Sequence, residues 1–292
     1  MVSSFRAGAL SVERLQASHL VETFAFLDRD PVLNVYLLAL VLRDALGQPR
    51  DEYWAVRRDG EMVGLLHLGG NSGAVLPIGD DDEAMRLLGD QARTRLSALP
   101  RRFQVIGPSH SVAAFLQRFE PSGLSPRLDR AQVYMALERS ELPSFSPLPD
   151  LVAAQPDDVL LLYETGADLR AEELEEDPRE VDPAGYRRRV EEEARDGHTF
   201  LWKDAEGLRF RASVSAITAD AAQVSGVFTP RERRRKAFAT LGLAELCGRL
   251  LQRSRAVCLF VNLNNAPALA LYRRLGFRDR SGWRSLFYDS SR

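Results

Sequence analysis

The chain has 292 residues, of which 45% are hydrophobic and 27% charged, and its formal net charge is -2. These proportions are typical of folded globular proteins and exclude a disordered or fibrous chain, while the length is sufficient for two domains. The weak negative charge provides no broad basic surface, so we do not expect nucleic acid as the main partner.

The longest apolar stretch, residues 32–42, is far shorter than the roughly 20 residues that a membrane-spanning helix needs. No basic-then-apolar leader opens the chain, so we expect a soluble cytoplasmic protein. Cys247 and Cys258 form no CxxC pair and lie in apolar periodic segments, which predicts buried packing residues. We expect no metal.

The first half predicts alternating helices and strands, which is typical of an α/β structure. Ser11 is expected to cap a helix that carries Glu13 and Leu15, and a second helix follows around Asn34 to Leu46. Asp59-Gly60 predicts a tight turn between two strands. The remaining predicted elements are a strand at 74–79, a helix at 81–99, a strand at 101–107, a helix at 111–119 and a strand at 131–137.

Residues 138–150 contain three prolines among serines and lack an apolar period, which indicates a linker. We therefore predict two domains, 1–142 and 143–292. The second half repeats the order of the first. Its predicted elements are helices at 157–169 and 184–197, a hairpin at 198–217, a strand at 222–229, a helix at 236–253, a strand at 256–263, a helix at 266–276 and a closing strand. The acidic run at 170–182 reads as a solvated surface segment or, alternatively, a substrate-facing lid.

The most specific pattern is a strand that ends at Thr229-Pro230, followed by an arginine-rich turn and at once by a helix. The first turn of a helix leaves backbone N–H groups without internal partners, and its dipole favours negative charge. Small side chains at Ala237 and Ala239 would let phosphate oxygens approach that backbone. The flanking cations 233–236 would add charge. The alternative is an exposed basic helix start.

A second pattern, Asn265, Ala268 and Tyr272 at helix-compatible spacing, follows the next strand. Together the two patterns resemble the Gcn5-related N-acetyltransferase (GNAT) superfamily, with its R/QxxGxG/A coenzyme A motif and its N-x-x-A-x-x-x-Y helix. The resemblance implies an α/β fold of two tandem GNAT-like domains, each a mixed, mostly antiparallel sheet flanked by helices. Its diagnostic motifs occupy about residues 224 to 277.

The resemblance also implies a cofactor site. The motif falls on Arg234, Ala237 and Ala239, and family members usually have glycine at the position of Ala237. We expect the alanine to be tolerated, because a helix does not itself need glycine there. Main-chain groups of the preceding strand would pair with the pantetheine arm. The implied cofactor residues are Val227, Phe228, Thr229, Arg234, Arg235, Lys236, Ala237, Phe238, Ala239, Thr240, Asn265 and Ala268.

By the same resemblance, Tyr272 protonates the departing thiolate. A phenol with a pKa of about 10 is protonated at neutral pH and can donate to sulfur. The amine acceptor needs a base, and Glu164 is our candidate, with Glu172, Glu173 or a relayed water as alternatives. His198 reads as structural.

The first half looks like a degenerate copy. Asp80, Asp81 and Asp82 lie at its corresponding helix start, where carboxylates would cap the helix and repel a diphosphate. Leu116 falls about where Tyr272 lies in the second half. This half also looks like the N-terminal domain of uncharacterised function that precedes some bacterial acetyltransferases, so we expect it to bind no coenzyme A.

The expected activity is N-acetyl transfer from acetyl-CoA to an amine in a ternary complex, with no aminoacyl donor, no nucleic acid and no membrane. One alternative is a non-catalytic module that binds acyl-CoA or a protein partner. Another is an aminoacyl-tRNA-dependent transferase, because tandem domains of this fold occur in peptidoglycan-building enzymes.

Overall fold

The computed structural model of the protein describes residues 9–120 and 123–290, and its contacts divide the chain into two compact units. The first unit takes in the described residues of Met1–Asp30, Leu40–Tyr134 and Arg280–Arg292, and the second takes in Pro31–Ala39 and Met135–Asp279. Both units combine segments that are distant in sequence. The domain boundary between residues 142 and 143 stays a prediction.

The strands of the first unit follow the order β1-β2-β3-β4-β5-β12-β6, and residues 135–138 of β6 and 278–279 of β12 belong to the second unit. Neighbouring strands are antiparallel from β1 to β4, and β12 is antiparallel to β5, whereas β4 and β5 are parallel. The strands are β1 (Leu10–Arg14), β2 (Glu52–Arg58), β3 (Glu61–Leu68), β4 (Ala74–Ile78), β5 (Arg102–Pro108), β6 (Leu128–Glu138) and β12 (Arg278–Asp289).

The helices of this unit pack on an apolar core in which Leu88, Val105 and Phe115 are fully buried. Asp81 begins α3 as its cap, because its carboxylate accepts hydrogen bonds from the Glu83 and Ala84 N–H groups at 3.0 Å each. The predicted capping role is thus confirmed. The helices are α1 (Leu20–Leu27), α3 (Asp82–Thr94) and α4 (Ser109–Phe119), and α2 (Val35–Asp44) spans residues of both units.

The predicted helix after Ser11 is wrong. Residues Leu10–Arg14 form β1, which pairs with β2 in the register Val12↔Val56. Side chains of a strand alternate between its two faces, and Leu10 and Val12 share one face. Five residues are too few to show a helical period in the sequence, and the pairing with β2 decides their conformation.

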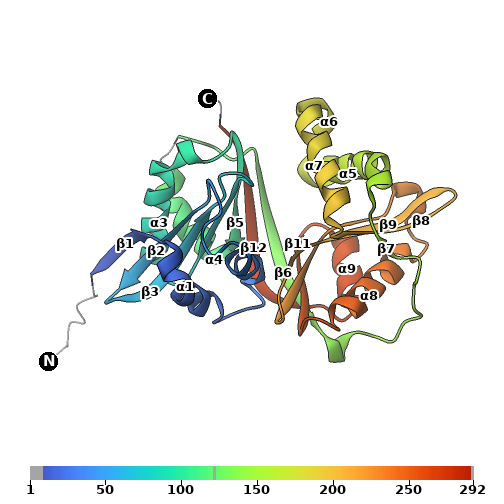
Figure 1. The fold of residues 1–292 in the computed structure, drawn as a ribbon, viewed down its shortest axis with the longest axis horizontal. Coiled ribbons are helices and arrows are strands. Elements are labelled where there is room, and N and C mark those ends of the chain that lie inside the picture. The colour runs from blue at the N-terminus through green and yellow to red at the C-terminus, as the bar shows by residue number, and fades with distance from the viewer. Residues whose placement is uncertain (1–8, 121–122, 291–292) are drawn as a thin grey trace. The chain divides into compact units, whose positions relative to one another are not determined.

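The strands of the second unit follow the order β11-β10-β9-β8-β7. Here β10 and β11 are parallel, and the other neighbours are antiparallel. Its strands are β7 (Val152–Ala153), β8 (Thr199–Asp204), β9 (Gly207–Ile217), β10 (Ala221–Phe228) and β11 (Ala256–Asn262). Figure 1 shows this sheet with helices on its faces.

The region predicted to be an acidic surface run contains the end of one helix of the second unit, α5, and the short helix α6. Helix α5 continues to Leu174, where Glu175 turns into the left-handed region with a φ of 56°. The helices are α5 (Val159–Leu174), α6 (Pro178–Val181), α7 (Pro183–Asp196), α8 (Phe238–Leu250) and α9 (Ala266–Arg274).

The two units repeat one plan. In each, an antiparallel meander of four strands leads through a helix into a fifth strand that is parallel to the fourth. This confirms the predicted fold class, a pair of mixed, mostly antiparallel sheets flanked by helices. The predicted hairpin is also present, with Asp59 and Gly60 at φ values of 50° and 88°, as a tight turn with the strand twist requires.

The last strand was expected to close the second half, but most of it lies in the first unit. Strand β12 pairs with β5 from Trp283↔Pro108 to Asp289↔Arg102. Arg284 of β12 forms an ion pair with Asp129 at 2.6 Å. No helix within the described ranges 9–120 and 123–290 is long and apolar enough to cross a membrane.

Candidate functional site

The parallel strands β10 and β11 pair only over a short stretch. Their register runs from Ala221↔Ala256 to Gln223↔Cys258, although β10 continues to Phe228 and β11 to Asn262. The strands therefore separate toward their carboxyl ends. Backbone groups of the outer part of β10 are left facing this opening rather than a ladder partner on β11.

A bulge shapes the same part of β10. Its register with β9 shifts between Ser225 and Phe228, and Gly226 has a φ of 60°. Only glycine adopts this conformation without steric cost. Val227 lies within the bulge and has no register partner on β9. Its main-chain groups are therefore suited to pair with a ligand outside the sheet.

The loop after β10 contains a 3-10 helix at Arg231–Arg233 and continues with one extended and two left-handed residues. Arg234 is extended, whereas Arg235 and Ala237 both have a φ of 62°. Ala237 is the residue just before α8, and its carbonyl accepts the first helical hydrogen bond, from Leu241 N–H at 3.0 Å. Our reason for expecting alanine to be tolerated was therefore wrong, because this position is not helical and left-handed alanine costs roughly 1–2 kcal/mol.

This loop presents donors to an anion. The N–H groups of Phe238, Ala239 and Thr240 precede the first helical hydrogen bond and have no acceptor within α8. Residues 234–235 form a turn, and successive N–H groups of a turn can form a concavity that binds anions. Arg235 and Lys236 are exposed beside it and form no ion pair within the part of the chain that the structure describes. These groups fit a diphosphate.

Arg233 does not belong to this set of available cations. Its side chain is buried, and it pairs with Glu206 at 2.6 Å and Asp204 at 3.6 Å. It anchors the loop to the β8–β9 turn.

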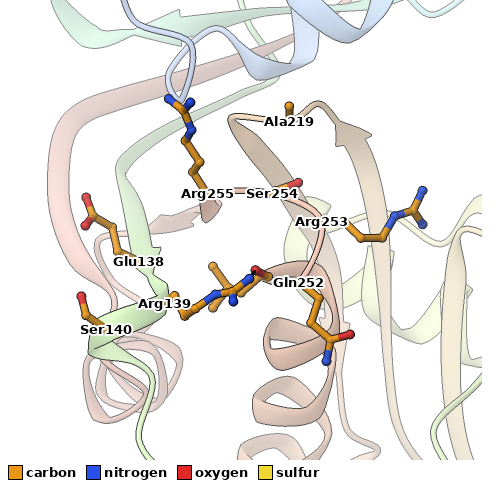
Figure 2. A pocket seen from close by; sticks show the side chains of 9 residues that line it. Glu138, Arg139, Ser140, Ala219, Gln252, Arg253, Ser254 and Arg255 are labelled. Atoms are coloured by element: carbon orange, nitrogen blue, oxygen red, sulfur yellow. Dashed lines mark hydrogen bonds between the residues drawn. The ribbon is translucent and has the colours of Figure 1, made fainter.

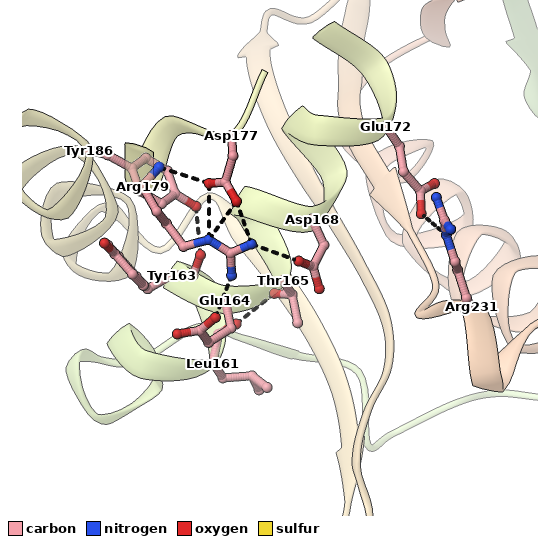
Figure 3. Close-up of polar contacts among 10 residues, drawn as sticks. All are labelled: Leu161, Tyr163, Glu164, Thr165, Asp168, Glu172, Asp177, Arg179, Tyr186 and Arg231. Carbon is pink, nitrogen blue, oxygen red and sulfur yellow. Dashed lines mark hydrogen bonds and ion pairs between the residues drawn. The ribbon is translucent and has the colours of Figure 1, made fainter. Parts of the chain in front are cut away.

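Arg234 is held on three sides. Its Nε donates to the Thr229 carbonyl at 3.0 Å, its Nη2 donates to Glu172 at 2.7 and 3.0 Å, and its guanidinium lies 5.7 Å from the centre of the Phe228 ring. Arg231 also donates to Glu172, at 2.8 Å (Figure 3). Burial acts to raise the pKa of Glu172, but the hydrogen bonds from the two arginines outweigh it and lower that pKa.

Tyr272 lies on α9, which begins next to the carboxyl end of β11. Asn265 caps this helix by accepting the Ala268 N–H at 3.2 Å. Tyr272 is buried against Phe277, with ring centroids 5.8 Å apart. Burial raises the pKa of Tyr272, and the charge of Glu173 raises it further. The hydroxyl is therefore protonated throughout the neutral range.

The acidic candidates on α5 differ in their surroundings. Glu164 accepts from Arg179 Nη1 at 2.6 Å, and the same guanidinium binds Asp177 at 2.7 Å and Asp168 at 3.2 Å (Figure 3). Glu164 is thus engaged in an ion pair with Arg179. Glu173 is different, because surrounding protein atoms desolvate it and raise its pKa to about 7, although solvent still reaches the side chain and screens part of the effect.

Sequence reasoning missed a buried polar network beneath the bulge. Arg211 is 3% exposed and donates to Glu193 at 2.5 Å. Glu193 also accepts from Thr199 at 2.6 Å, and the Thr199 and Ser213 hydroxyls lie 2.7 Å apart. Desolvation lowers the pKa of Arg211. The available signal was Arg211 between Phe210 and Ala212, at a position of β9 flanked on both sides by apolar residues.

A cavity of about 630 Å³ lies at the other end of α8, between that helix's carboxyl end and residues 138–140. Arg253 and Arg255 on its rim point in different directions (Figure 2). Arg139 instead donates to the Leu251 carbonyl and so caps the helix. The thirteen-residue α8 separates this cavity from the loop 229–237. The side chains that line this cavity do not point toward a common centre.

Comparisons with known proteins agree with this geometry. The sequence model of the FR47-like protein family matches residues 209–287, and no curated protein matches the chain. A tandem GNAT protein from the clavulanic acid biosynthesis pathway, solved without acetyl-CoA, is 19% identical with a TM-score of 0.56, covering 97% of this chain and 100% of its own. A GCN5-related N-acetyltransferase from Sphaerobacter thermophilus is 18% identical with a TM-score of 0.58, covering 96% and 94%. A GNAT-family acetyltransferase from Colwellia psychrerythraea is 10% identical with a TM-score of 0.58, covering 95% and 99%.

Residues 209–287 thus resemble the FR47-like family, and the chain shares its fold with the solved GNAT proteins. At these identities the likeness to solved structures is one of fold. Because β10 and β11 are parallel neighbours, the loop 229–237 and Asn265 both follow carboxyl ends at the same edge of the sheet. The charge of Glu173 acts on Tyr272. Glu164 is instead engaged with Arg179. The roles of the predicted site residues stay predictions, and no group of side chains in the described residues could hold a metal ion.

Proposed function

We propose that the chain is an acyl-CoA-dependent N-acyltransferase that transfers acetyl from acetyl-CoA to an amine by direct attack in a ternary complex. The observation that carries the proposal is the left-handed loop that leads into the amino end of α8, beside the opening between β10 and β11. Its unpaired N–H groups suit a diphosphate, and the opening suits an extended arm that pairs with β10.

Each group of the site has a distinct task in this scheme. The N–H groups of 238–240, with Arg235 and Lys236, would hold the diphosphate, and the bulged main chain near Val227 would orient the thioester carbonyl. The amine nitrogen attacks the carbonyl carbon, and the C–S bond breaks. Tyr272 then donates its hydroxyl proton to the departing sulfur and regains one from solvent.

The proton that the ammonium acceptor must lose needs a separate base. Glu173 suits this task better than our first candidate, Glu164, because a pKa of about 7 lets a carboxylate take up a proton near neutral pH. The Glu164 carboxylate is already paired with the Arg179 guanidinium. We therefore assign the base role to Glu173.

The proposal is tested with Tyr272→Phe. We expect coenzyme A affinity by calorimetry to be unchanged, and free-thiol release with acetyl-CoA and an amine panel to fall roughly 100-fold or more. Tyr186→Phe is the matched control, since this buried tyrosine donates to the Tyr163 carbonyl at 2.8 Å and has no part in the scheme. Unchanged release by the Tyr272 variant removes the acid role. Binding without release for every amine supports a non-catalytic module.

A further inference from the structure

Glu172 joins helix α5 to the loop that follows β10. Its carboxylate accepts hydrogen bonds from Arg231 Nε at 2.8 Å and from Arg234 Nη2 at 2.7 Å. Both arginines belong to the loop, and about a quarter of the Glu172 side chain is exposed. Because its pKa is lowered, the carboxylate is charged at neutral pH.

The ion pair with Glu172 engages Arg234, the arginine of the motif that resembles the coenzyme A motif of the superfamily. Arg234 Nε is already used by the Thr229 carbonyl and Nη2 by Glu172, so a diphosphate that binds Nη2 has to take the place of the Glu172 carboxylate. A diphosphate offers more charge and more acceptor oxygens than one carboxylate, and it binds guanidinium in the same planar geometry.

Helix α5 also contacts the bulge. A Cβ placed on Gly226 would lie 3.7 Å from Leu169 Cδ2, so Leu169 packs at the point where β10 leaves its ladder. Leu169 and Glu172 are three residues apart and lie on neighbouring positions of the same helical face. Helix α5 thus contacts both the loop 229–237 and the bulge of β10.

We propose that Glu172 is a latch: it holds Arg231 and Arg234 until the diphosphate of coenzyme A takes its place on Arg234, and this exchange loosens the carboxyl end of α5. The inference rests on the proposed function. It makes Glu172 a positioning residue that lowers cofactor affinity and couples cofactor arrival to the helix beside the bulge. In this order of events the cofactor binds first, the carboxyl end of α5 loosens, and the amine acceptor binds afterwards.

The first test is calorimetry on the full chain with Glu172→Gln, which keeps the shape and removes the charge. Coenzyme A should bind about five- to tenfold more tightly than to the wild type, with the gain largest at low salt, because a repelling charge beside the diphosphate is gone. Pantetheine, which has no phosphate, should bind both proteins equally. Asp168→Asn is the control, since it removes a carboxylate from the same helix that pairs with Arg179 instead.

The second test is hydrogen exchange in residues 170–174. Coenzyme A should speed exchange there in the wild type, whereas Glu172→Gln should exchange fast without it. Equal or weaker binding of coenzyme A by Glu172→Gln overturns the latch, as does exchange that cofactor leaves unchanged. If the wild type binds no coenzyme A at all, the proposed function itself fails, which the wild-type titration shows separately.

Discussion

Ala237 holds a backbone conformation that costs energy for any residue with a Cβ. It lies at a φ of 62° immediately before α8, and its side chain is exposed. Ala237→Gly removes the steric clash of left-handed alanine, so we expect the free energy of unfolding in urea to rise by about 1 kcal/mol. Because the relaxed loop keeps its shape, coenzyme A affinity should be unchanged or tighter.

Ala239→Gly is the matched control for that prediction. Ala239 lies inside the first turn of α8, where glycine loses more conformational entropy than alanine. The free energy of unfolding should therefore fall by roughly 0.5–1 kcal/mol. Two alanine-to-glycine changes two residues apart should thus act in opposite directions, and a loss for both would show that Ala237 is not strained.

Glu173 gives the protein a pH dependence of defined sign. Its pKa is raised from 4.5 to about 7, chiefly by desolvation, so the folded state favours the protonated carboxyl. The stability that Glu173 contributes is complete below pH 4.5 and is lost as pH rises through about 7. Urea unfolding at several pH values should show this decline in the wild type and a flatter profile in Glu173→Gln. Parallel profiles would contradict the shift.

At the residue scale, the sequence predicted the motif positions but not their partners. Arg234 and Ala237 were found from local spacing, because a strand, a turn and a helix start are adjacent in the chain. The ion pair of Arg234 with Glu172 joins residues 62 positions apart. No local pattern encodes such a contact, and the same holds for Arg211 and Glu193.

At the element scale, periodicity predicted the long helices and the central strands, and it failed where elements are short. The two-residue β7 has no period to detect, and β1 was mistaken for a helix. The prediction for α8 began two residues early, at Lys236, because its start is set by the left-handed turn at Ala237 rather than by a polar cap.

The bulge of β10 leads to a prediction about one element. Gly226→Ala adds a Cβ with ordinary space, 3.5 Å from Ser213 Oγ, so its cost comes from the φ of 60° and should be about 1–2 kcal/mol. Gly197→Ala is the control, because Gly197 follows α7 at a φ of 67° with open space around it. Both variants should lose similar stability in urea. Only Gly226→Ala should also weaken binding of acetyl-CoA by calorimetry, and equal binding by both variants would separate the bulge from the cofactor.

At the scale of the whole molecule, the sequence predicted a repeated plan because each half has the same order of helices and strands. The place of the last strand could not be predicted this way. Strand β12 follows α9 in the chain, but its partner β5 lies more than 170 residues earlier. Order along the chain identifies the elements, whereas pairing depends on which edge of a sheet is free in space.

Because β12 pairs with β5, the stability of the first unit depends on residues 280–289. Leu286 of β12 is 1% exposed in the apolar core of that unit. Leu286→Ala should cost about 2–5 kcal/mol and lower the hydrogen-exchange protection of β5 and α4. Leu201→Ala, at a fully buried position of β8, should instead lower protection in the second unit. If residues 143–292 fold as one independent domain, Leu286→Ala would reduce protection of β10 and β11 and leave β5 unchanged. The pattern of lost protection therefore decides whether the sequence boundary or the strand pairing defines the folding units.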